Sequence, residues 1–260
     1  MPYMVPVILV VQSRSNGVAI NLEKMSIQRE LDALATVVFV SALDTNISWT
    51  EPALLLKNYD GLILGGSGDF DFDGGRLTSD PARQATTELT GRLAPLLEYV
   101  FDTDFPTLGI CFGHQLLGAF RGAQVVNDSN QMKTRSHIVS KIAIAGDTSI
   151  FTGMPTDFLA HYVHKDALDR VPDGAVLLAC GGAACQVSAL RYKRNIYSTQ
   201  FHPELTFADV ERRVNTFPGY LPPGETVGAT FTPMGDCTAL MRNFITHVEQ
   251  IATVISKVRA

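Results

Sequence analysis

Short apolar runs, separated by longer mixed stretches, mark the first half of the chain. They occupy residues 5–11, 36–40, 61–64 and 107–110. Runs of this length without polar alternation are typical of parallel strands buried on both faces. The stretches between them are long enough for crossover connections, so the pattern predicts a parallel sheet.

Helical spacing of apolar residues appears between these runs. Leu22, Met25, Leu31 and Leu34 recur at roughly helical intervals within residues 20–34. A second helix is predicted over residues 81–101, where Pro81 suits a first turn. The order of strand, helix and strand predicts an α/β fold.

The second half of the chain changes character. Residues 137–145 and parts of 185–201 alternate apolar and polar positions, which predicts antiparallel strands. Residues 217–233 hold four prolines and three glycines, and we interpret them as a surface loop. Residues 235–258 repeat apolar positions at helical spacing and predict a C-terminal helix.

These elements predict one α/β domain over residues 1–260. We expect a central, mostly parallel sheet flanked by helices, with a small antiparallel sheet at one side and a long loop insertion at about 207–230. Because long loops beside a catalytic strand often carry specificity, this insertion is expected to border the mouth of the active site.

Composition narrows the classes of partner. The 260 residues carry a formal net charge of -5, which gives no positive field for nucleic acid or an anionic membrane. No apolar run reaches the ~18–20 residues that cross a bilayer, and no basic region precedes the first apolar stretch. The four cysteines form no dense disulfide framework and no pair of Cys-x-x-Cys motifs, so reduced thiols in a cytoplasm are the simplest interpretation, with no metal and no cofactor.

Cys111 stands where a predicted strand ends and a helix begins, with Gly109 and Gly113 two positions to either side. This is the pattern of a nucleophile elbow, in which a sharp turn projects the nucleophile above the sheet. A sulfur near a helix N-terminus is favoured as thiolate. A buried structural cysteine beside packing glycines remains the alternative. For an elbow we expect Cys111 to be accessible and close to its base.

A histidine and a carboxylate follow another predicted strand. His202 and Glu204 lie two residues apart after the run 195–201. His202 can accept a thiol proton and return it to a leaving amine, while Glu204 can orient the ring through its other nitrogen. Taken alone, His-Pro-Glu is a common loop sequence.

Glycines follow the strand at 61–64. Backbone N–H groups in this turn could stabilise the oxyanion of a tetrahedral intermediate, and the natural pair is the N–H of Gly66 with that of Phe112. A plain turn or a phosphate loop are the alternatives. No lysine follows these glycines, which argues against the phosphate loop.

Together these segments resemble the class I, triad-type glutamine amidotransferases, which have a flavodoxin-like fold. The Gly-x-Cys-x-Gly-His-Gln motif matches residues 109–115, Phe-His-Pro-Glu matches 201–204, and the glycine turn matches 61–69. A fourth segment, 160–166, resembles the family's His-x-Asp motif. The chain is most similar to the amidotransferase domain of GMP synthases, without a synthetase domain after it.

The resemblance implies roles for particular residues. Cys111, His202 and Glu204 would form the catalytic triad, and Gly66 with Phe112 the oxyanion hole. Gln115 and the backbone around Lys165 and Asp166 would bind the amino-acid end of a γ-glutamyl substrate. His114, beside the motif cysteine, is interpreted as a packing residue at the start of a helix. His137, His161 and His247 are interpreted as surface or core residues, and the other three cysteines as packing residues.

Three functions fit this pattern. The first is hydrolysis of glutamine through a cysteine thioester, which releases glutamate and ammonia to a possible synthetase partner. The second keeps the same triad but cleaves a γ-glutamyl peptide or amine conjugate, with no ammonia acceptor. The third is a non-catalytic regulatory protein on the same fold.

Overall fold

The computed structural model describes residues 5–131, 133–143, 150–221, 223–233 and 237–258, with the side chains of 254–258 left out. One sheet of nine strands runs through the molecule in the order β2-β1-β3-β4-β11-β10-β9-β6-β7. Its parallel part comprises β1 (Val7–Gln12), β2 (Thr36–Ser41), β3 (Gly61–Leu64), β4 (Thr107–Ile110) and β11 (Ile196–Thr199).

The antiparallel strands extend this same sheet at one edge. They are β10 (Ala189–Arg191), β9 (Val176–Cys180), β6 (Lys133–Lys141) and β7 (Asp157–His164). A separate pair, β5 (Val125–Val126) and β8 (Ala167–Leu168), forms the small antiparallel sheet. The predicted fold class is therefore confirmed.

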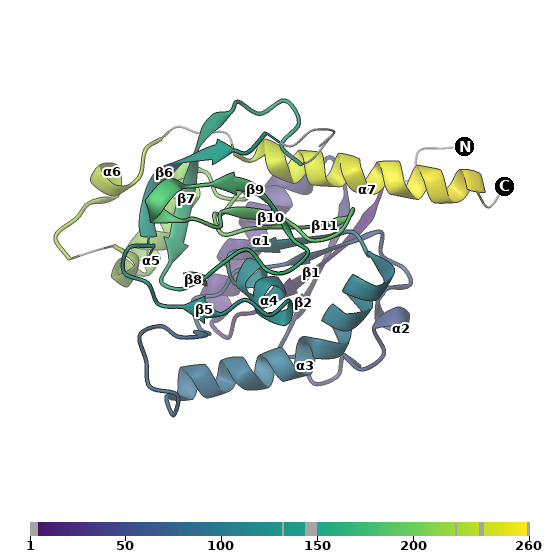
Figure 1. Ribbon diagram of the computed structural model, residues 1–260, viewed down its shortest axis with the longest axis horizontal. Coiled ribbons are helices and arrows are strands. Elements are labelled where there is room, and N and C mark those ends of the chain that lie inside the picture. Colours follow the sequence, from purple (N-terminus) through teal and green to yellow (C-terminus); the bar gives the residue numbers. More distant parts are fainter. Residues whose placement is uncertain (1–4, 132, 144–149, 222, 234–236, 259–260) are drawn as a thin grey trace.

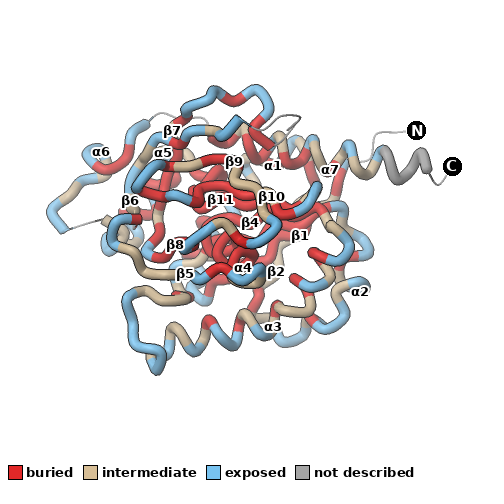
Figure 2. Tube along the Cα trace, in the orientation of Figure 1, coloured by how far each residue is buried: buried red, intermediate tan, exposed pale blue. Residues whose placement is uncertain are grey.

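Helices cover both faces of the sheet (Figure 1). Ile8 and Val10 of β1 pack in one buried cluster with side chains of α1 (Gly17–Leu31) and α7 (Ala239–Val258). Leu9 and Val11 alternate with them and pack in a second cluster with α3 (Pro81–Thr103) and α4 (Phe112–Phe120). Successive side chains of a strand point to opposite faces, so the apolar run in β1 supplies both clusters. Figure 2 shows this buried centre, with exposed residues on the outer helices.

Several predicted boundaries shift by a few residues, as expected for boundaries inferred from sequence. The first strand ends at Gln12, and the first helix runs over Gly17–Leu31 because Asn16 caps it by accepting from the N–H groups of Val18 and Ala19. Two endpoints of predicted elements, Ala145 and Gly235, lie outside the described residues.

The predicted loop insertion at 207–230 is wrong in its first half. Residues Phe207–Thr216 form helix α5, which Thr206 and Asp209 start with a reciprocal capping box. Beyond it follow the short helical turn η2 (Pro218–Tyr220) and α6 (Val227–Thr230). The remaining short elements are α2 (Pro52–Leu56) and η1 (Gly182–Ala184). The expected surface loop at 217–233 thus contains two helical turns.

Along the described part of the chain, no helix is both long and apolar enough to cross a membrane.

Candidate active site

Cys111 occupies a strained turn between β4 and α4. Its backbone lies at φ 52° and ψ −99°, a combination that side chains with a Cβ rarely adopt. Such conformations cost of order 1–3 kcal/mol and persist where the surrounding structure enforces them. The geometry is that of the predicted elbow, at the carboxyl end of a central strand.

The two glycines flanking Cys111 permit this turn. A Cβ at Gly109 would lie 2.7 Å from the Gly113 carbonyl oxygen, and a Cβ at Gly113 would overlap the Leu64 carbonyl oxygen. The close approach of α4 to β4 therefore requires glycine at position 109, and its close approach to β3 requires glycine at position 113. It places the sulfur at the first turn of a helix whose N–H groups have no acceptor within the helix.

Cys111 is less accessible than predicted, because only 3% of the residue is exposed. Its sulfur lies 3.9 Å from the Val163 carbonyl oxygen and 3.7 Å from the Gln200 side-chain nitrogen. Neighbours from β7 and from the end of β11 therefore enclose the thiol. Cys111 nevertheless lines a cavity of about 380 Å³, so a small substrate can reach it.

His202 and Glu204 form a buried hydrogen-bonded pair. His202 Nδ1 donates to Glu204 Oε1 at 2.7 Å, which leaves Nε2 as the ring nitrogen available to Cys111 and the substrate. Burial alone would lower the pKa of His202, but the charge of Glu204 and the neighbouring Cys111 sulfur outweigh it and raise this pKa to about 10. Burial opposes ionisation of Glu204 as well, yet His202 holds the Glu204 pKa below its ordinary value.

Gly66 lies next to both His202 and Cys111. A Cβ built on Gly66 would lie 3.1 Å from His202 Cε1 and 3.6 Å from Cys111 Cβ. The glycine turn, the elbow and the His-Pro-Glu segment, far apart in the sequence, thus meet at one point. This proximity supports the predicted grouping of the three motifs.

The orientation of the Gly66 N–H differs from the prediction. This N–H donates to Glu23 Oε1 at 3.0 Å, so it does not face the Cys111 sulfur. The same oxygen of Glu23 also binds Arg14 Nη2 at 3.1 Å. This ion pair fixes the Glu23 carboxylate, which in turn fixes the direction of the Gly66 N–H. Of the predicted oxyanion pair, Phe112 retains an N–H at the first position of α4.

The predicted substrate residues Gln115, Lys165 and Asp166 all line the large cavity. The side-chain nitrogen of Gln115 donates to the Asp166 carbonyl oxygen at 2.6 Å, so it positions the segment after β7. The Asp166 carboxylate accepts the N–H groups of Asp73 and Gly74 at 2.8 Å each. The Asp166 side chain is therefore committed to the protein, and so is its carbonyl oxygen, which also meets His164 Nδ1 at 3.0 Å. The backbone N–H of Asp166 is the group that it can offer to a ligand.

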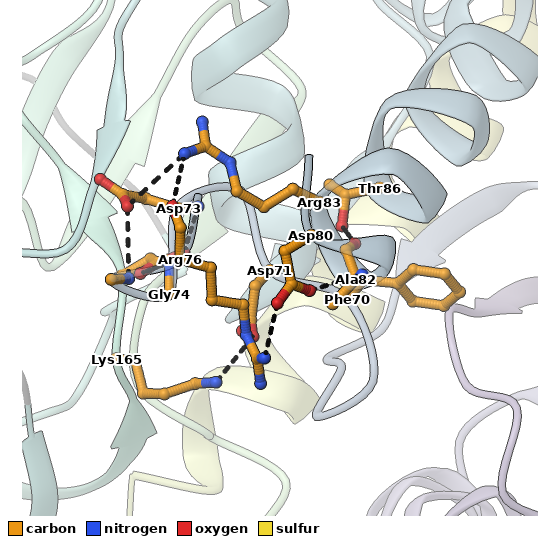
Figure 3. Close-up of polar contacts among 12 residues, drawn as sticks. Phe70, Asp71, Asp73, Gly74, Arg76, Asp80, Ala82, Arg83, Thr86 and Lys165 are labelled. Atoms are coloured by element: carbon orange, nitrogen blue, oxygen red, sulfur yellow. Dashed lines mark hydrogen bonds and ion pairs between the residues drawn. The ribbon is translucent and has the colours of Figure 1, made fainter. Parts of the chain in front are cut away.

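A network of charged side chains joins residues 71–83 to Lys165 (Figure 3), and its members Asp71 and Lys165 line the large cavity. Asp71 Oδ2 binds Lys165 Nζ at 2.8 Å and Arg76 Nε at 2.9 Å, and Arg76 also reaches Asp80 at 3.2 Å. These ion pairs tie residues 71–80 to the segment after β7. Lys165 thus lines the cavity directly and also fixes Asp71 in the cavity wall.

Sequence reasoning missed two buried arginines near His202. Arg14 and Arg213 line a second cavity of about 20 Å³, together with His202, Ser67 and Tyr220. Arg14 could have been found, because it follows β1 at the carboxyl edge of the sheet, where ligands gather. No sequence signal marks Arg213, which lies on the predicted loop.

The other buried histidines stay neutral. His114 binds Ser198 Oγ at 2.8 Å, and burial with the nearby His164 lowers its pKa to about 3. Burial also lowers the pKa of His161 and His164 to about 4. His114 is thus a packing residue of α4, as predicted. His161 is closer to the site than expected, since its carbonyl oxygen accepts the His202 N–H at 3.0 Å.

Known proteins share this architecture. The family model "Glutamine amidotransferase class-I" matches residues 19–214. A glutamine-hydrolysing GMP synthase subunit from Archaeoglobus fulgidus is 31% identical over 157 residues, which cover 60% of this chain and 72% of that protein. The protein of the same name from Thermoplasma acidophilum is 32% identical over 161 residues, or 61% of this chain and 70% of its own.

A solved structure extends the likeness of the fold to almost the whole chain. The crystal structure of a glutamine amidotransferase from Thermotoga maritima superposes with a TM-score of 0.69 and covers 95% of this chain and 99% of its own, at 17% identity. At that identity the comparison shows only that the two proteins share a fold.

Proposed function

Because the chain belongs to the class I glutamine amidotransferase family, we propose that it hydrolyses the side-chain amide of glutamine, or of a related γ-glutamyl compound, through a thioester on Cys111. The observation that carries this proposal is the strained position of Cys111 on the wall of the large cavity, beside the bonded pair of His202 and Glu204.

In the first half of the proposed reaction, Cys111 and His202 act as a thiolate and an imidazolium. The thiolate attacks the γ-carbonyl carbon, and the developing oxyanion meets the N–H of Phe112. His202 Nε2 then gives its proton to the leaving nitrogen, the C–N bond breaks, and a γ-glutamyl thioester remains. Gly66 would add a second donor only if its N–H turned away from Glu23.

In the second half, water attacks the thioester while His202 Nε2 takes one of its protons. The C–S bond breaks, glutamate leaves, and the thiolate is restored. Glu204 stays ionised throughout and stabilises the imidazolium. Gln115 and the backbone at Lys165 and Asp166 are proposed to hold the amino-acid end of the substrate, since they line the same cavity as Cys111.

The proposed fate of the nitrogen depends on the substrate. With glutamine, ammonia would pass to a synthetase partner, an idea supported by relatives that are named as one subunit of a GMP synthase. With a γ-glutamyl conjugate, an amine would leave and no acceptor would be needed.

The test is an assay of the purified chain on glutamine and on γ-glutamyl amides, with glutamate release as the readout. The parent protein should turn over at least one of them, and mass spectrometry after acid quenching should find the thioester on Cys111. A protein with no turnover and no labelling of Cys111 by a glutamine-like diazoketone would instead be a binding protein on this fold.

A further inference from the structure

The small cavity beside His202 is an extension of the substrate cavity. Its volume is about 20 Å³, and it shares Ser67, Val163 and Tyr220 with the large cavity. Cys111 and Gln115 line only the large cavity, whereas His202 and Arg213 line only the small one. The proposed point of bond cleavage, at Cys111 and His202, therefore borders both spaces.

Under the proposed function, this arrangement determines how the substrate is oriented across the two cavities. The glutamyl part occupies the large cavity beside Gln115, and the leaving nitrogen must face His202 to receive a proton. Any group attached to that nitrogen then points toward the small cavity. The residues there determine which leaving group fits.

Arg213 contributes hydrogen-bond donors that lack an acceptor to the wall of the small cavity. The residue is only 8% exposed, and its Nε and Nη2 atoms have no hydrogen-bond partner among the described residues. Arg14, the other guanidinium in the wall, is already paired with Glu23. None of the described residues that line the cavity is acidic. The nearby Glu204 carboxylate offsets part of the charge of Arg213, but it does not accept a hydrogen bond from either of these atoms. A buried donor without an acceptor is costly, so an anionic group that enters here is stabilised.

We propose that this cavity is a leaving-group subsite in which Arg213 binds a carboxylate. The preferred substrates are then γ-glutamyl amino acids, in which the leaving amine carries a carboxylate on the adjacent carbon. A volume of about 20 Å³ admits only the terminal atoms of such a group, which favours glycine or another small residue. Leaving groups with a second positive charge are disfavoured by the two guanidinium groups.

The test compares substrates of equal size and different charge. γ-Glutamylglycine carries the carboxylate, and γ-glutamylglycinamide replaces it with a neutral amide. The parent protein should show kcat/KM at least about tenfold higher for γ-glutamylglycine, the discrimination expected of a charged hydrogen bond. In Arg213→Met this ratio should fall to about one. Equal kcat/KM values for the two substrates in the parent protein would overturn the proposal.

Arg212→Met is the matched control. Arg212 is the neighbouring residue on α5, its side chain is 47% exposed, and it pairs with Asp209 at 3.4 Å. It lines neither cavity, so the parent ratio should be retained. If Arg213→Met does not fold, Arg213→Lys, which keeps the charge but loses the guanidinium donors, should still reduce the ratio, and an unchanged ratio would refute the proposal.

An experiment with formate distinguishes a subsite for the substrate carboxylate from a site that binds free anions. If formate alters glutamine turnover through Arg213 while the two conjugates react equally, the site binds free anions and the leaving-group assignment is wrong. Labelling of Cys111 by the diazoketone is measured in every variant. Loss of turnover and labelling in the parent protein itself refutes the proposed function, whereas labelling with no charge preference refutes only the subsite.

Discussion

The Gly66 N–H is bound to the carboxylate of Glu23, 3.0 Å away, and not directed at the catalytic candidate Cys111. Glu23 is 1% exposed and also binds Arg14 and the side-chain nitrogen of Gln12, the latter at 3.0 Å. A single buried carboxylate on α1 thus fixes the glycine turn, the end of β1 and a buried guanidinium.

Replacing Glu23 should destabilise the protein strongly. Glu23→Ala leaves the 3% exposed Arg14 without its counter-charge, and the expected loss in the free energy of unfolding is about 3–5 kcal/mol. Urea unfolding measures it. Arg135→Ala, which removes an exposed pair with Glu225, should cost less than about 1 kcal/mol. The double variant Arg14→Met/Glu23→Met should recover most of the loss, and failure to recover it would contradict this explanation.

The strained backbone of Cys111 predicts that a variant can lose activity and yet gain stability. Cys111→Ala and Cys111→Gly should both abolish hydrolysis, but only glycine relieves the strain at φ 52°. Relief of about 1–3 kcal/mol, less the entropy cost of glycine, should make Cys111→Gly more stable than Cys111→Ala by about 1 kcal/mol. Thermal and urea unfolding of the two variants decide this. Equal stabilities would show that the turn is not strained.

The motifs around Cys111 could be predicted because each rests on a local rule. A glycine on either side of a cysteine after an apolar run specifies the elbow, and its neighbours confirm why glycine is needed. Arg213 escaped prediction because its burial depends on the packing of α5 between distant segments. The direction of the Gly66 N–H likewise depends on Glu23, 43 residues earlier in the chain. Helix α5 itself was predictable from Thr206 and Asp209, whose capping box was overlooked.

Glu204→Gln should reduce hydrolysis and change its pH dependence. The glutamine still accepts a hydrogen bond from His202, but it no longer offsets the burial that lowers the His202 pKa. We expect kcat/KM to fall at least about tenfold while staying above that of Cys111→Ala. With His202 as the acid, the basic limb of the pH profile of kcat/KM lies near pH 10 in the parent protein. In the variant this limb should move to lower pH. Glu211→Gln, an exposed change on α5, is the control. An unmoved limb would exclude His202 as the acid.

Buried neutral histidines should make the protein sensitive to acid. The pKa of His164 is about 4 in the folded protein, below the ordinary 6.5, so the unfolded chain binds more protons between these values. The free energy of unfolding should therefore fall as pH decreases from 6.5 to about 4. In His164→Gln the slope should decrease by about 1.4 kcal/mol per pH unit. Above about pH 7 the two slopes should coincide, and parallel curves below it would contradict the assignment.

Tyr220 should control the bulk of the leaving group. It is the last residue of η2, lines both cavities and packs over the glycine turn, since a Cβ on Gly68 would lie 2.5 Å from the Tyr220 hydroxyl. Phe217 supports the Tyr220 ring edge to face, with centroids 5.9 Å apart. Phe217, Gly219 and Tyr220, which belong to the expected surface loop, thus line the same cavity as Cys111.

Tyr220→Ala should widen both cavities where they adjoin and relax selection by size. The kcat/KM for a γ-glutamyl conjugate with a bulky amino acid should rise relative to that for γ-glutamylglycine, because a large side chain that lines both cavities is lost. Pro223→Ala, an exposed change on the same segment, should leave this ratio unchanged. Labelling of Cys111 by the diazoketone should persist in both variants, since Tyr220 does not position the triad. If the ratio stays the same while labelling persists, Tyr220 is a passive part of the wall, and selection by size must come from other apolar residues that line the small cavity, such as Val163 and Phe231.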